Sequence, residues 1–490
     1  MVSLATVRPL VVAIASAMLA ACAVGPNHVY PAMQVPERFV QAEAGTDVAT
    51  ADHATNAFDS EFWRGFNDPL LTRLVDDALS ANHDLRIALA NLDRANALLR
   101  GAKFDYLPTI TAQGQASDNR ASADQQPGVS RADRDYESYS VGAQASWELD
   151  LFGRVRRSVE AQRADLHASS ADLQALQVAI VGEVANTYVA LRGSQERLRV
   201  ARQNADNQAQ TLKLVEARFN AGRGTEFDTS RARAQLEATR SRVPALEAQV
   251  AVSMHRLAVL TGHMPEALIP ELTPSGALPV LPARIDPSTP GDLLRHRPDV
   301  AAAEQRLHAA TARIGVATAD LFPRFTLGGL IGSQAAGTGA LFSRDSETHL
   351  VALGIDWSFL DVGRVRARIK AANADAEGQL AQYEKTVLLA LEDTENALVR
   401  HDRARSEDAH LEQAALDSAK AAQLARLRYH AGATDLFEVL DAERTQLQAE
   451  DAFADARTRS VGSAISLYKA LAGGWPDRLP ERRKLAARSP

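Results

Sequence analysis

The stretch WELDLFGRVR at residues 147–156 returns as WSFLDVGRVR at residues 357–366. Other short stretches return in the same order and at nearly the same offset. These pairs are RFNAG at 218–222 with RYHAG at 428–432, LTG at 260–262 with LAG at 471–473, and Asp84 through Pro108 with Asp299 through Pro323. Four ordered anchors indicate an internal duplication, because chance similarity between alanine-rich helices would not repeat the Trp and Gly positions.

Each copy contains two segments in which apolar and polar residues alternate. In residues 139–151 the odd positions read Tyr, Val, Ala, Ala, Trp, Leu and Leu, and the even positions are polar or glycine. Similar runs follow Pro108 and Pro323, and a fourth covers residues 351–359. Alternation predicts β-strands, each about long enough to cross a bilayer when tilted. The polar segments 118–138 and 333–348 are expected to be solvent loops.

Only four such strands are predicted, and it must be asked whether four strands can close a β-barrel. A half-buried sheet of a soluble protein also alternates, so the pattern alone leaves that alternative open. An open sheet edge is not tolerated in lipid, and four strands cannot close a barrel. If these strands span a membrane, several chains must therefore share one barrel. Trp147 and Trp357, near the strand ends, suit the aromatic girdle of such a barrel.

Long helices are predicted between the strands. Residues 154–219 and 364–429 contain no proline. The first of these segments has heptad-spaced apolar residues at Leu166, Leu173 and Ile180, and, after one shift of register, at Val184, Leu191 and Leu198. At 1.5 Å per residue each would reach about 100 Å. Shorter helices of up to about 55 Å are expected at 69–104, 225–261, 299–320 and 435–472. Shorter helices stacked end to end beside the long ones predict a rod or tube.

The first 22 residues read as an export signal. Arg8 supplies a positive charge, residues 9–21 are apolar, and this run is too short to span a membrane as a helix. It ends at LAAC, residues 19–22, which resembles the lipobox of bacterial lipoproteins. Cys22, the single cysteine of the chain, is therefore predicted to carry an acyl group. The alternative is an ordinary signal peptide followed by an incidental cysteine.

Composition argues against several functional classes. The net charge is −7 with no basic block, which does not favour nucleic-acid binding. We find no phosphate-binding loop, no nucleophile elbow and no HExxH motif. One cysteine can build neither an internal disulfide nor a cysteine-based metal site. The sequence therefore predicts neither an enzyme nor a cofactor, and no metal site.

Several stretches together resemble the OprM/NodT class of outer-membrane efflux lipoproteins, which are TolC-like outer-membrane factors. They are CAVGPN at 22–27, WRGFNDPLL at 63–71, RPDVAAAEQ at 297–305 and LYKALAGGW at 467–475. The resemblance implies a mainly α protein with a membrane β-barrel portion. Three chains of four strands each would form a twelve-stranded barrel in the outer membrane, above a periplasmic tunnel of helices. The homotrimer would contact outer-membrane lipid, a periplasmic membrane-fusion adaptor and an inner-membrane pump of the resistance-nodulation-division class, and would conduct solutes passively.

The duplicated stretches and the resemblance together divide the chain into six segments. They are the lipoprotein signal peptide 1–21, a lipidated N-terminal segment 22–68, a first efflux repeat 69–262, a linker 263–298, a second efflux repeat 299–473, and a polar tail 474–490. Within each repeat a tight turn reverses the long helix. Gly222, Gly224 and Gly432 lie in these turns, where glycine permits a left-handed helix cap.

The resemblance also implies a gate at these turns, which would form the periplasmic tip. Arg428 and Tyr429 match the pair that locks the tip, and Phe437 matches an apolar ring. Asp441 matches an aspartate ring at the constriction, and Glu438 falls where some members place a second aspartate. Asp228 matches an acceptor on the neighbouring hairpin. Thr434 stands where some members hold a locking arginine, so that contact is not expected here.

Local explanations exist for the same residues. Residues 225–228 and 435–438 both fit a capping box, which would account for Asp228 and Glu438. Asp441 fits a solvated helix face, and Arg428 fits a basic side chain at a helix C-terminus. Two functions besides efflux also stay open. One is a duct for type I protein secretion, and the other is a lipid-anchored coiled-coil scaffold without a pore.

Overall fold

The computed structural model describes residues 23–40, 55–56, 61–280, 285–286, 289–472, 476 and 478–482. The chain divides into two compact units. The first comprises Met1–Ala32, Leu92–Ser170 and Ala302–Glu384, and the second comprises Met33–Asn91, Ala171–Ala301 and Lys385–Pro490. The predicted signal segment and its acceptor Cys22 lie outside the described residues.

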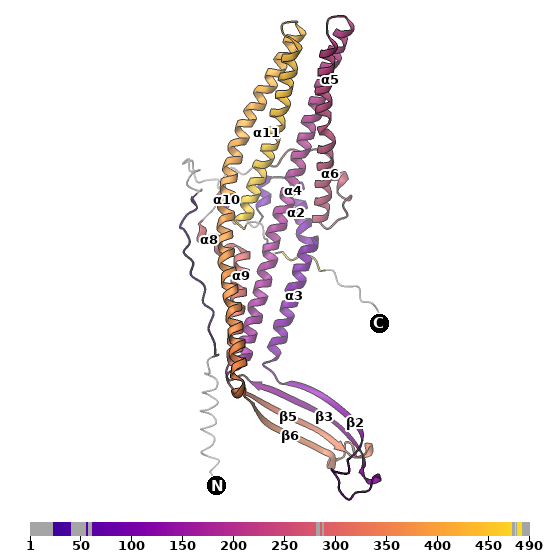
Figure 1. Cartoon of the computed structure of the whole chain (residues 1–490), viewed down its shortest axis with the longest axis vertical. Helices are drawn as coiled ribbons and strands as arrows, with labels where there is room; N and C mark the ends of the chain where they lie inside the picture. The colour runs from indigo at the N-terminus through magenta and orange to yellow at the C-terminus, as the bar shows by residue number, and fades with distance from the viewer. Residues whose placement is uncertain are drawn as a thin grey trace. The chain divides into compact units, whose positions relative to one another are not determined.

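The first unit contains one antiparallel sheet of four strands (Figure 1). Its strands are β2 (Thr109–Arg120), β3 (Asp135–Leu149), β5 (Arg324–Ala335) and β6 (Glu347–Asp356), in the order β2-β3-β5-β6. The four predicted strands are thus confirmed. The predicted loops were too long, because β2, β3, β5 and β6 extend into them with ladder hydrogen bonds, and only residues 121–134 and 336–346 connect the strands.

The register gathers most of the large apolar residues of the four strands on one face, and the pair Leu330↔Leu350 lies on the other. Opposite residues in paired strands share a face, and the pairs Ile110↔Ala145, Ala143↔Ile331 and Leu327↔Leu353 carry one face across the sheet. Trp147 pairs with Leu327 on this same face. The side chains of Ile110, Ile331, Val351, Leu353 and Ile355 are 61–77% exposed in the single chain. So large an exposed apolar face is typical of a membrane or partner surface.

The ends of the strands are fastened to the helices in the same way in both copies. The indole nitrogen of Trp147 donates a hydrogen bond to the carbonyl of Tyr106 at 3.1 Å, and that of Trp357 donates to Leu321 at 3.0 Å. Each acceptor lies two residues before the proline that precedes a strand. The prediction that the fourth strand continues to residue 359 is wrong: β6 ends at Asp356, and Phe359–Asp361 form a 3-10 turn.

The two long helices are confirmed within a few residues. They are α4 (Arg154–Asn220) and α10 (Val362–His430). Each contributes its first part to the first unit and its last part to the second. In the first unit they accompany α9 (Pro298–Ala319) and the end of α3 (His83–Phe104), with small clusters such as Leu99, Val155 and Val159 between them.

Two helices that were predicted to be continuous are broken. The segment 69–104 divides into α2 (Pro69–Ala81) and α3 at Asn82. The side chain of Asn82 accepts hydrogen bonds from Asp84 and Leu85 and donates one to Leu260, so it caps the new helix from a buried position. The segment 225–261 divides at Ser241 into α5 (Glu226–Arg240) and α6 (Arg242–Leu260). Pro244 then lies in the first turn of α6, where proline is tolerated.

The second unit also holds α11 (Leu436–Ala470), which returns from the end of α10 and forms a helical hairpin with it. The α4/α5 pair forms the other hairpin (Figure 1). An aromatic cluster of this unit joins a 3-10 helix, η3 (Phe62–Phe66), to α11, where Phe62 stacks on Tyr468 with ring centroids 4.6 Å apart.

Short elements complete the chain. In the second unit a two-stranded parallel pair, β1 (Thr55–Asn56) with β4 (Ile285–Asp286), was not predicted. The linker region contains the short helices α7 (Ile269–Leu272) and α8 (Pro290–His296). The strand connections of the first unit hold the 3-10 turns η4 (Ala132–Arg134), η5 (Thr338–Ala340) and η6 (Arg344–Ser346), and η7 follows β6 at Phe359–Asp361. Among the described helices, none combines the length and the apolar character needed to cross a bilayer.

Candidate functional site

The two hairpins of the second unit reverse in nearly identical turns. Gly222 and Gly432 have φ of 69° and 74°, in the left-handed region that favours glycine. The amide of Arg223 donates to the carbonyl of Arg218, and that of Ala433 donates to Arg428, each at 2.8 Å. This is the Schellman pattern, and it confirms the predicted glycine caps at these two positions.

Gly224 differs from the other two glycines. Its φ is not in the left-handed region, and a Cβ at this position would lie 3.3 Å from the backbone nitrogen of Phe219. The reason for glycine here is thus close approach to the end of α4, so the prediction of a left-handed cap at Gly224 is wrong.

Asp228 lies in the first turn of α5 and closes a capping box. Its carboxylate accepts hydrogen bonds from the amide of Thr225 at 3.0 Å and from the Thr225 hydroxyl at 2.7 Å. The Thr225 hydroxyl oxygen in turn accepts from the Asp228 amide. Capping accounts for an acid at this position. A role for Asp228 as acceptor for the hairpin of a neighbouring chain stays a prediction.

The second hairpin forms only half of its predicted capping box. Asp435 accepts from the amide of Glu438 at 3.1 Å, as an N-cap does. The Glu438 carboxylate instead turns outward, where it accepts from the Thr434 hydroxyl and lies 3.8 Å from Arg428. Arg428 and Glu438 are both more than half exposed, so they are accessible at the surface of the tip.

Tyr429 is buried in its own chain. Its side chain is 6% exposed and packs with Val215, Ala232, Leu436 and Val439. The guanidinium of Arg218 lies over its ring, with Cζ 4.0 Å from the centroid, and donates to the Tyr429 carbonyl at 3.0 Å. In this structure Tyr429 therefore joins the ends of α4 and α10. Sequence reasoning missed Arg218, although the duplicated RFNAG motif marks it as the counterpart of Arg428.

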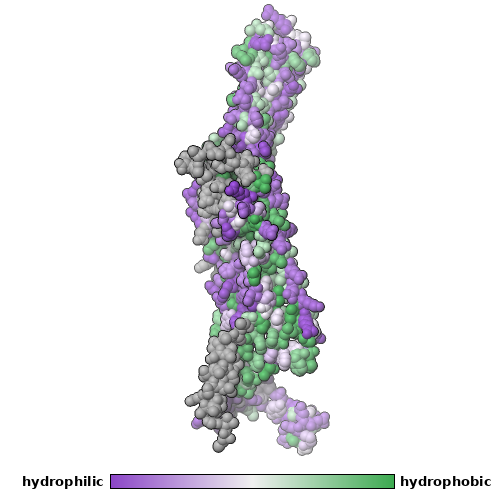
Figure 2. Space-filling model, turned by 90° about the vertical axis from the view of Figure 1, so that its left-hand side faces the viewer, coloured by the Kyte–Doolittle hydropathy of each residue, from purple (hydrophilic) through white to green (hydrophobic). Residues whose placement is uncertain are grey.

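Phe437 and Asp441 lie on the surface of α11. The Phe437 ring is 53% exposed and has the guanidinium of Arg231 4.5 Å from its centroid. Asp441 makes an ion pair with Arg444 at 2.5 Å, and its side chain is 47% exposed. Hydrophilic side chains predominate at the end of the hairpins in Figure 2. Of the predicted gate residues, the structure brings Arg428 and Glu438 into contact and gives Phe437 and Asp441 arginine partners that were not foreseen.

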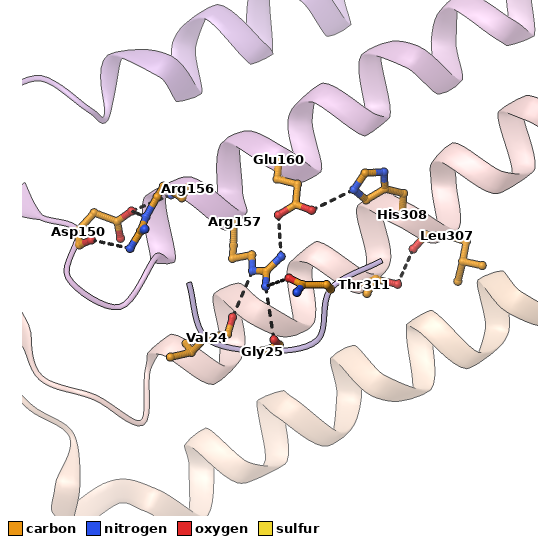
Figure 3. Close-up of polar contacts among 10 residues, drawn as sticks. Val24, Gly25, Asp150, Arg156, Arg157, Glu160, Leu307, His308 and Thr311 are labelled. Atoms are coloured by element: carbon orange, nitrogen blue, oxygen red, sulfur yellow. Dashed lines mark hydrogen bonds and ion pairs between the residues drawn. The ribbon is translucent and has the colours of Figure 1, made fainter. Parts of the chain in front are cut away.

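A separate polar cluster in the first unit fastens the N-terminal segment (Figure 3). Arg157, whose side chain is 5% exposed, donates to the carbonyls of Val24 and Gly25 at 3.2 and 3.4 Å and to the side chain of Asn27 at 2.7 Å. Its remaining contact is with Glu160 at 2.8 Å. We call these contacts the N-terminal clasp. The sequence offered no signal for it, because the Val24, Gly25 and Asn27 partners lie about 130 residues from Arg157 and two of them are backbone carbonyls.

Histidines extend the clasp. His308 Nε2 lies 3.0 Å from Glu160, and the ring of His28 stacks on His308 with centroids 4.4 Å apart. Burial acts to raise the pKa of Glu160, but the hydrogen bonds from His308 and Arg157 prevail and lower it. The parallel rings do not direct their nitrogen lone pairs to one point. In the described parts of the chain, no group of three or more His, Cys, Asp or Glu side chains could hold a metal ion.

A wide groove lies along α10 and α11 in the second unit, with a volume of about 930 Å³. Charged side chains of both signs line it, among them Glu392, Asp393, Arg400, Arg403, Glu407 and Arg459. Such mixed charge suits a polar protein partner better than an apolar ligand.

Comparison with known proteins identifies one family across the chain. The profile of the family described as "Outer membrane efflux protein" matches residues 74–263 and 289–473. The pyoverdine export outer membrane protein OpmQ of Pseudomonas putida is 34% identical over 91% of this chain and 95% of its own length. The outer membrane protein OprJ of Pseudomonas aeruginosa is 33% identical over 94% of both chains.

The fold has solved counterparts. The structure of the outer-membrane channel OprN superimposes with a TM-score of 0.85 at 40% identity, and the match covers 93% of this chain and all of that one. The sheet, the two long helices and the two hairpins therefore belong to a known channel architecture.

Proposed function

The chain belongs to the outer membrane efflux protein family, and from that premise we propose that three copies form the exit duct of a tripartite efflux system. It is an outer-membrane channel protein with a TolC-like fold rather than an enzyme. The proposed duct carries drugs or other small solutes passively, and the energy comes from an inner-membrane pump of the resistance-nodulation-division class.

The observation that carries this proposal is the open sheet of the first unit. Its outer strands, β2 and β6, each pair on one side only, and its apolar face is continuous across all four strands. Unpaired strand edges cannot remain in lipid. Three copies joined edge to edge give twelve strands and remove every edge, which accounts for the exposed apolar residues as a lipid-facing surface.

The proposed gate is the periplasmic end of the hairpins. Threefold symmetry would bring three copies of Asp441 close to one axis, where like charges repel one another and attract cations. The accessible pair of Arg428 and Glu438 supplies charged groups for contacts that hold the tip closed. We propose an iris-like opening in which these contacts exchange.

The proposed partners follow from the same surfaces. The groove of mixed charge along α10 and α11 suits a periplasmic membrane-fusion adaptor. The lipobox-like LAAC supports acylation of Cys22 and a second anchorage in the outer membrane.

Single-particle electron microscopy of the detergent-extracted protein tests the proposal most directly. A hollow tube with threefold symmetry, together with single-channel conductance in planar bilayers, is the expected result. A thin solid rod without conductance would reject the duct and favour the lipid-anchored scaffold. Replacing Cys22 with Ala should remove acylation and leave membrane insertion intact. A fully water-soluble C22A variant would contradict the barrel.

A further inference from the structure

A band of polar side chains is buried between α4 and α11, about two to four turns from the hairpin tips. We call it the buried seam and define it by Asn204, Gln208 and Thr211 of α4 and Glu443, Gln446 and Glu450 of α11. Five of the six are at most 8% exposed, and Glu443 is 1% exposed. Charged residues are seldom so deeply buried in a helical hairpin unless they are paired.

The contacts of the seam set its register. The Thr211 hydroxyl donates to Glu443 Oε1 at 2.8 Å, and the Asn204 side-chain amide donates to Glu450 at 2.8 Å. Because the two helices run antiparallel, three residues back along α4 correspond to three residues forward along α11. Gln208 therefore lies opposite Gln446, between these two hydrogen-bonded pairs.

Several buried atoms of the seam lack a hydrogen-bond partner. They are Glu443 Oε2, Gln446 Oε1 and both side-chain polar atoms of Gln208. Most buried polar atoms of proteins are hydrogen-bonded, and leaving one unpaired destabilises the packed state. Three of the four atoms are hydrogen-bond acceptors, so the seam has too few hydrogen-bond donors. A proton on Glu443 would supply one donor and remove a buried negative charge.

Resting on the function proposed above, we infer that Glu443 is a proton-binding site that locks the two hairpins together. A proton taken from solvent water forms an O–H bond at Glu443 Oε2. This O–H donates to an unpaired amide oxygen of the seam, directly or through one bridging water. Loss of the proton returns a negative charge to the buried layer and leaves Oε2 without a hydrogen-bond partner, which favours separation of α11 from α4 and access of water.

The surroundings of Glu443 agree with this assignment. Burial raises the pKa of Glu443, while Thr211 and Arg426 act to lower it. From α10, Arg426 approaches Oε1 at 3.3 Å. From α4 come the neutral side chains of Thr211, Gln208 and Asn204, and α5 contributes Gln235, which donates to the Leu440 carbonyl. Along α11, Glu450 is the other carboxylate of the seam and is already hydrogen-bonded by Asn204 and Gln446.

The direction of the pH effect follows from linkage. A carboxyl whose pKa is raised in the packed state binds its proton more tightly there than in water. Lowering the pH through that raised pKa, towards the ordinary value of about 4.3, therefore favours the packed and closed state. Raising the pH above it favours the state in which Glu443 is hydrated.

The layer next to the seam shows why polarity matters at this place. On the tip side of Glu443, the cluster of Val215, Ala232, Leu436, Val439 and Leu440 is apolar and holds the hairpins together at any pH. An apolar seam would continue that cluster. A polar seam with unmet hydrogen bonds is instead a layer whose stability depends on protonation and hydration.

The test is the pH dependence of opening in the full-length trimer. Open probability is measured in planar bilayers from about pH 8 to about pH 5 for the native protein, E443Q, D441N and E412Q. The amide of E443Q keeps an oxygen for the Thr211 hydroxyl and cannot lose a charge-bearing proton. E412Q replaces an exposed carboxylate of α10 and is the matched control. D441N separates the effect of the proposed constriction ring from that of the seam.

We expect the open probability of the native protein and of E412Q to fall about fivefold on acidification. This factor is the low end of the range for a coupling between two sites. E443Q should stay closed over the whole range, with its response reduced to less than about twofold. A native pH response in E443Q, or a response abolished only by D441N, would overturn the proton site. Absence of any channel in the native protein would instead reject the proposed function.

Hydrogen exchange gives a second readout should E443Q not assemble. In the native protein, amides of α11 between Leu436 and Glu450 should be better protected at the lower pH, after correction for the intrinsic exchange rate. Equal or weaker protection at the lower pH would overturn the inference without reference to conductance.

Discussion

The guanidinium of Arg218 covers the ring of Tyr429, 4.0 Å from its centroid, and joins the end of α4 to the end of α10. It also donates to the Tyr429 carbonyl at 3.0 Å. This pair therefore connects the two hairpins close to their turns. Four predictions about the tips and the N-terminal clasp follow from it and from the contacts described above.

Replacing Arg218 with Ala should loosen the tips. A partly exposed cation–π contact and a charge-assisted hydrogen bond together contribute about 2 kcal/mol. We expect faster hydrogen exchange at residues 425–436 and a higher open probability. R218K keeps the charge but not the planar group, so it should restore part of the effect. Unchanged exchange in R218A would show that the apolar cluster alone holds the tips.

Replacing Asp441 with Ala should alter cation conductance and selectivity, because the variant removes a carboxylate from the proposed constriction. R444A is the matched control, since it leaves the carboxylate in place and removes its ion-pair partner. D441A should weaken cation preference, and R444A should preserve or strengthen it. Identical selectivity in D441A and the native channel would leave Asp441 as a solvated surface residue.

Replacing Gly222 or Gly432 with Ala should destabilise the turns by about 1–2 kcal/mol each, because an L-residue pays that cost in the left-handed region. A Cβ at either position meets no atom within 4 Å, so the cost is conformational rather than steric. Gly378, in an open position of α10, is the control. G378A should stabilise its helix by about 0.5–1 kcal/mol. Hydrogen exchange of the amides around each substituted position distinguishes the three variants.

Replacing Arg157 with Ala should release the N-terminal clasp. The variant removes four hydrogen bonds and leaves the carbonyls of Val24 and Gly25 without their donor. We expect rapid proteolysis near residues 24–30 in R157A. R154A is the control, because Arg154 makes its two side-chain hydrogen bonds with Glu148 of β3. A Cβ on Gly25 would lie 2.5 Å from the Cα of Gly315, so these two backbones are in close contact. If both variants resist the protease equally, then this contact is sufficient to hold the segment.

The periodic patterns of apolar and polar residues predicted the strands and the long helices correctly. The alternation in residues 139–151 placed Val141, Ala143 and Trp147 on one face, and the register of β3 with β5 confirms it. The long helices were equally clear, because no proline or cap interrupts residues 154–219. Asn82 escaped notice although its capping bonds are local, to the amides of Asp84 and Leu85; only its contact with the carbonyl of Leu260 is distant along the chain.

Roles at the tips were harder to predict for a related reason. Arg218 and Arg428 occupy the same slot of the duplicated motif, yet one covers Tyr429 and the other faces Glu438. The sequence predicts the position of each arginine in the motif. It does not predict the residue that the arginine contacts, because that depends on how the two hairpins pack. Tyr429 was predicted to form a lock together with Arg428, and in the single chain its side chain is buried in the cluster between the hairpins.

The open sheet has a genetic consequence. In the proposed trimer, strands β2 and β6 of one chain are completed by strands of the other chains, so a defective chain spoils every assembly that it enters. If three chains combine at random, a cell that makes normal and defective copies in equal amounts keeps roughly one in eight assemblies free of the defect. Substitutions that break a single outer strand should therefore be dominant, whereas those that abolish export or synthesis of the chain should be recessive.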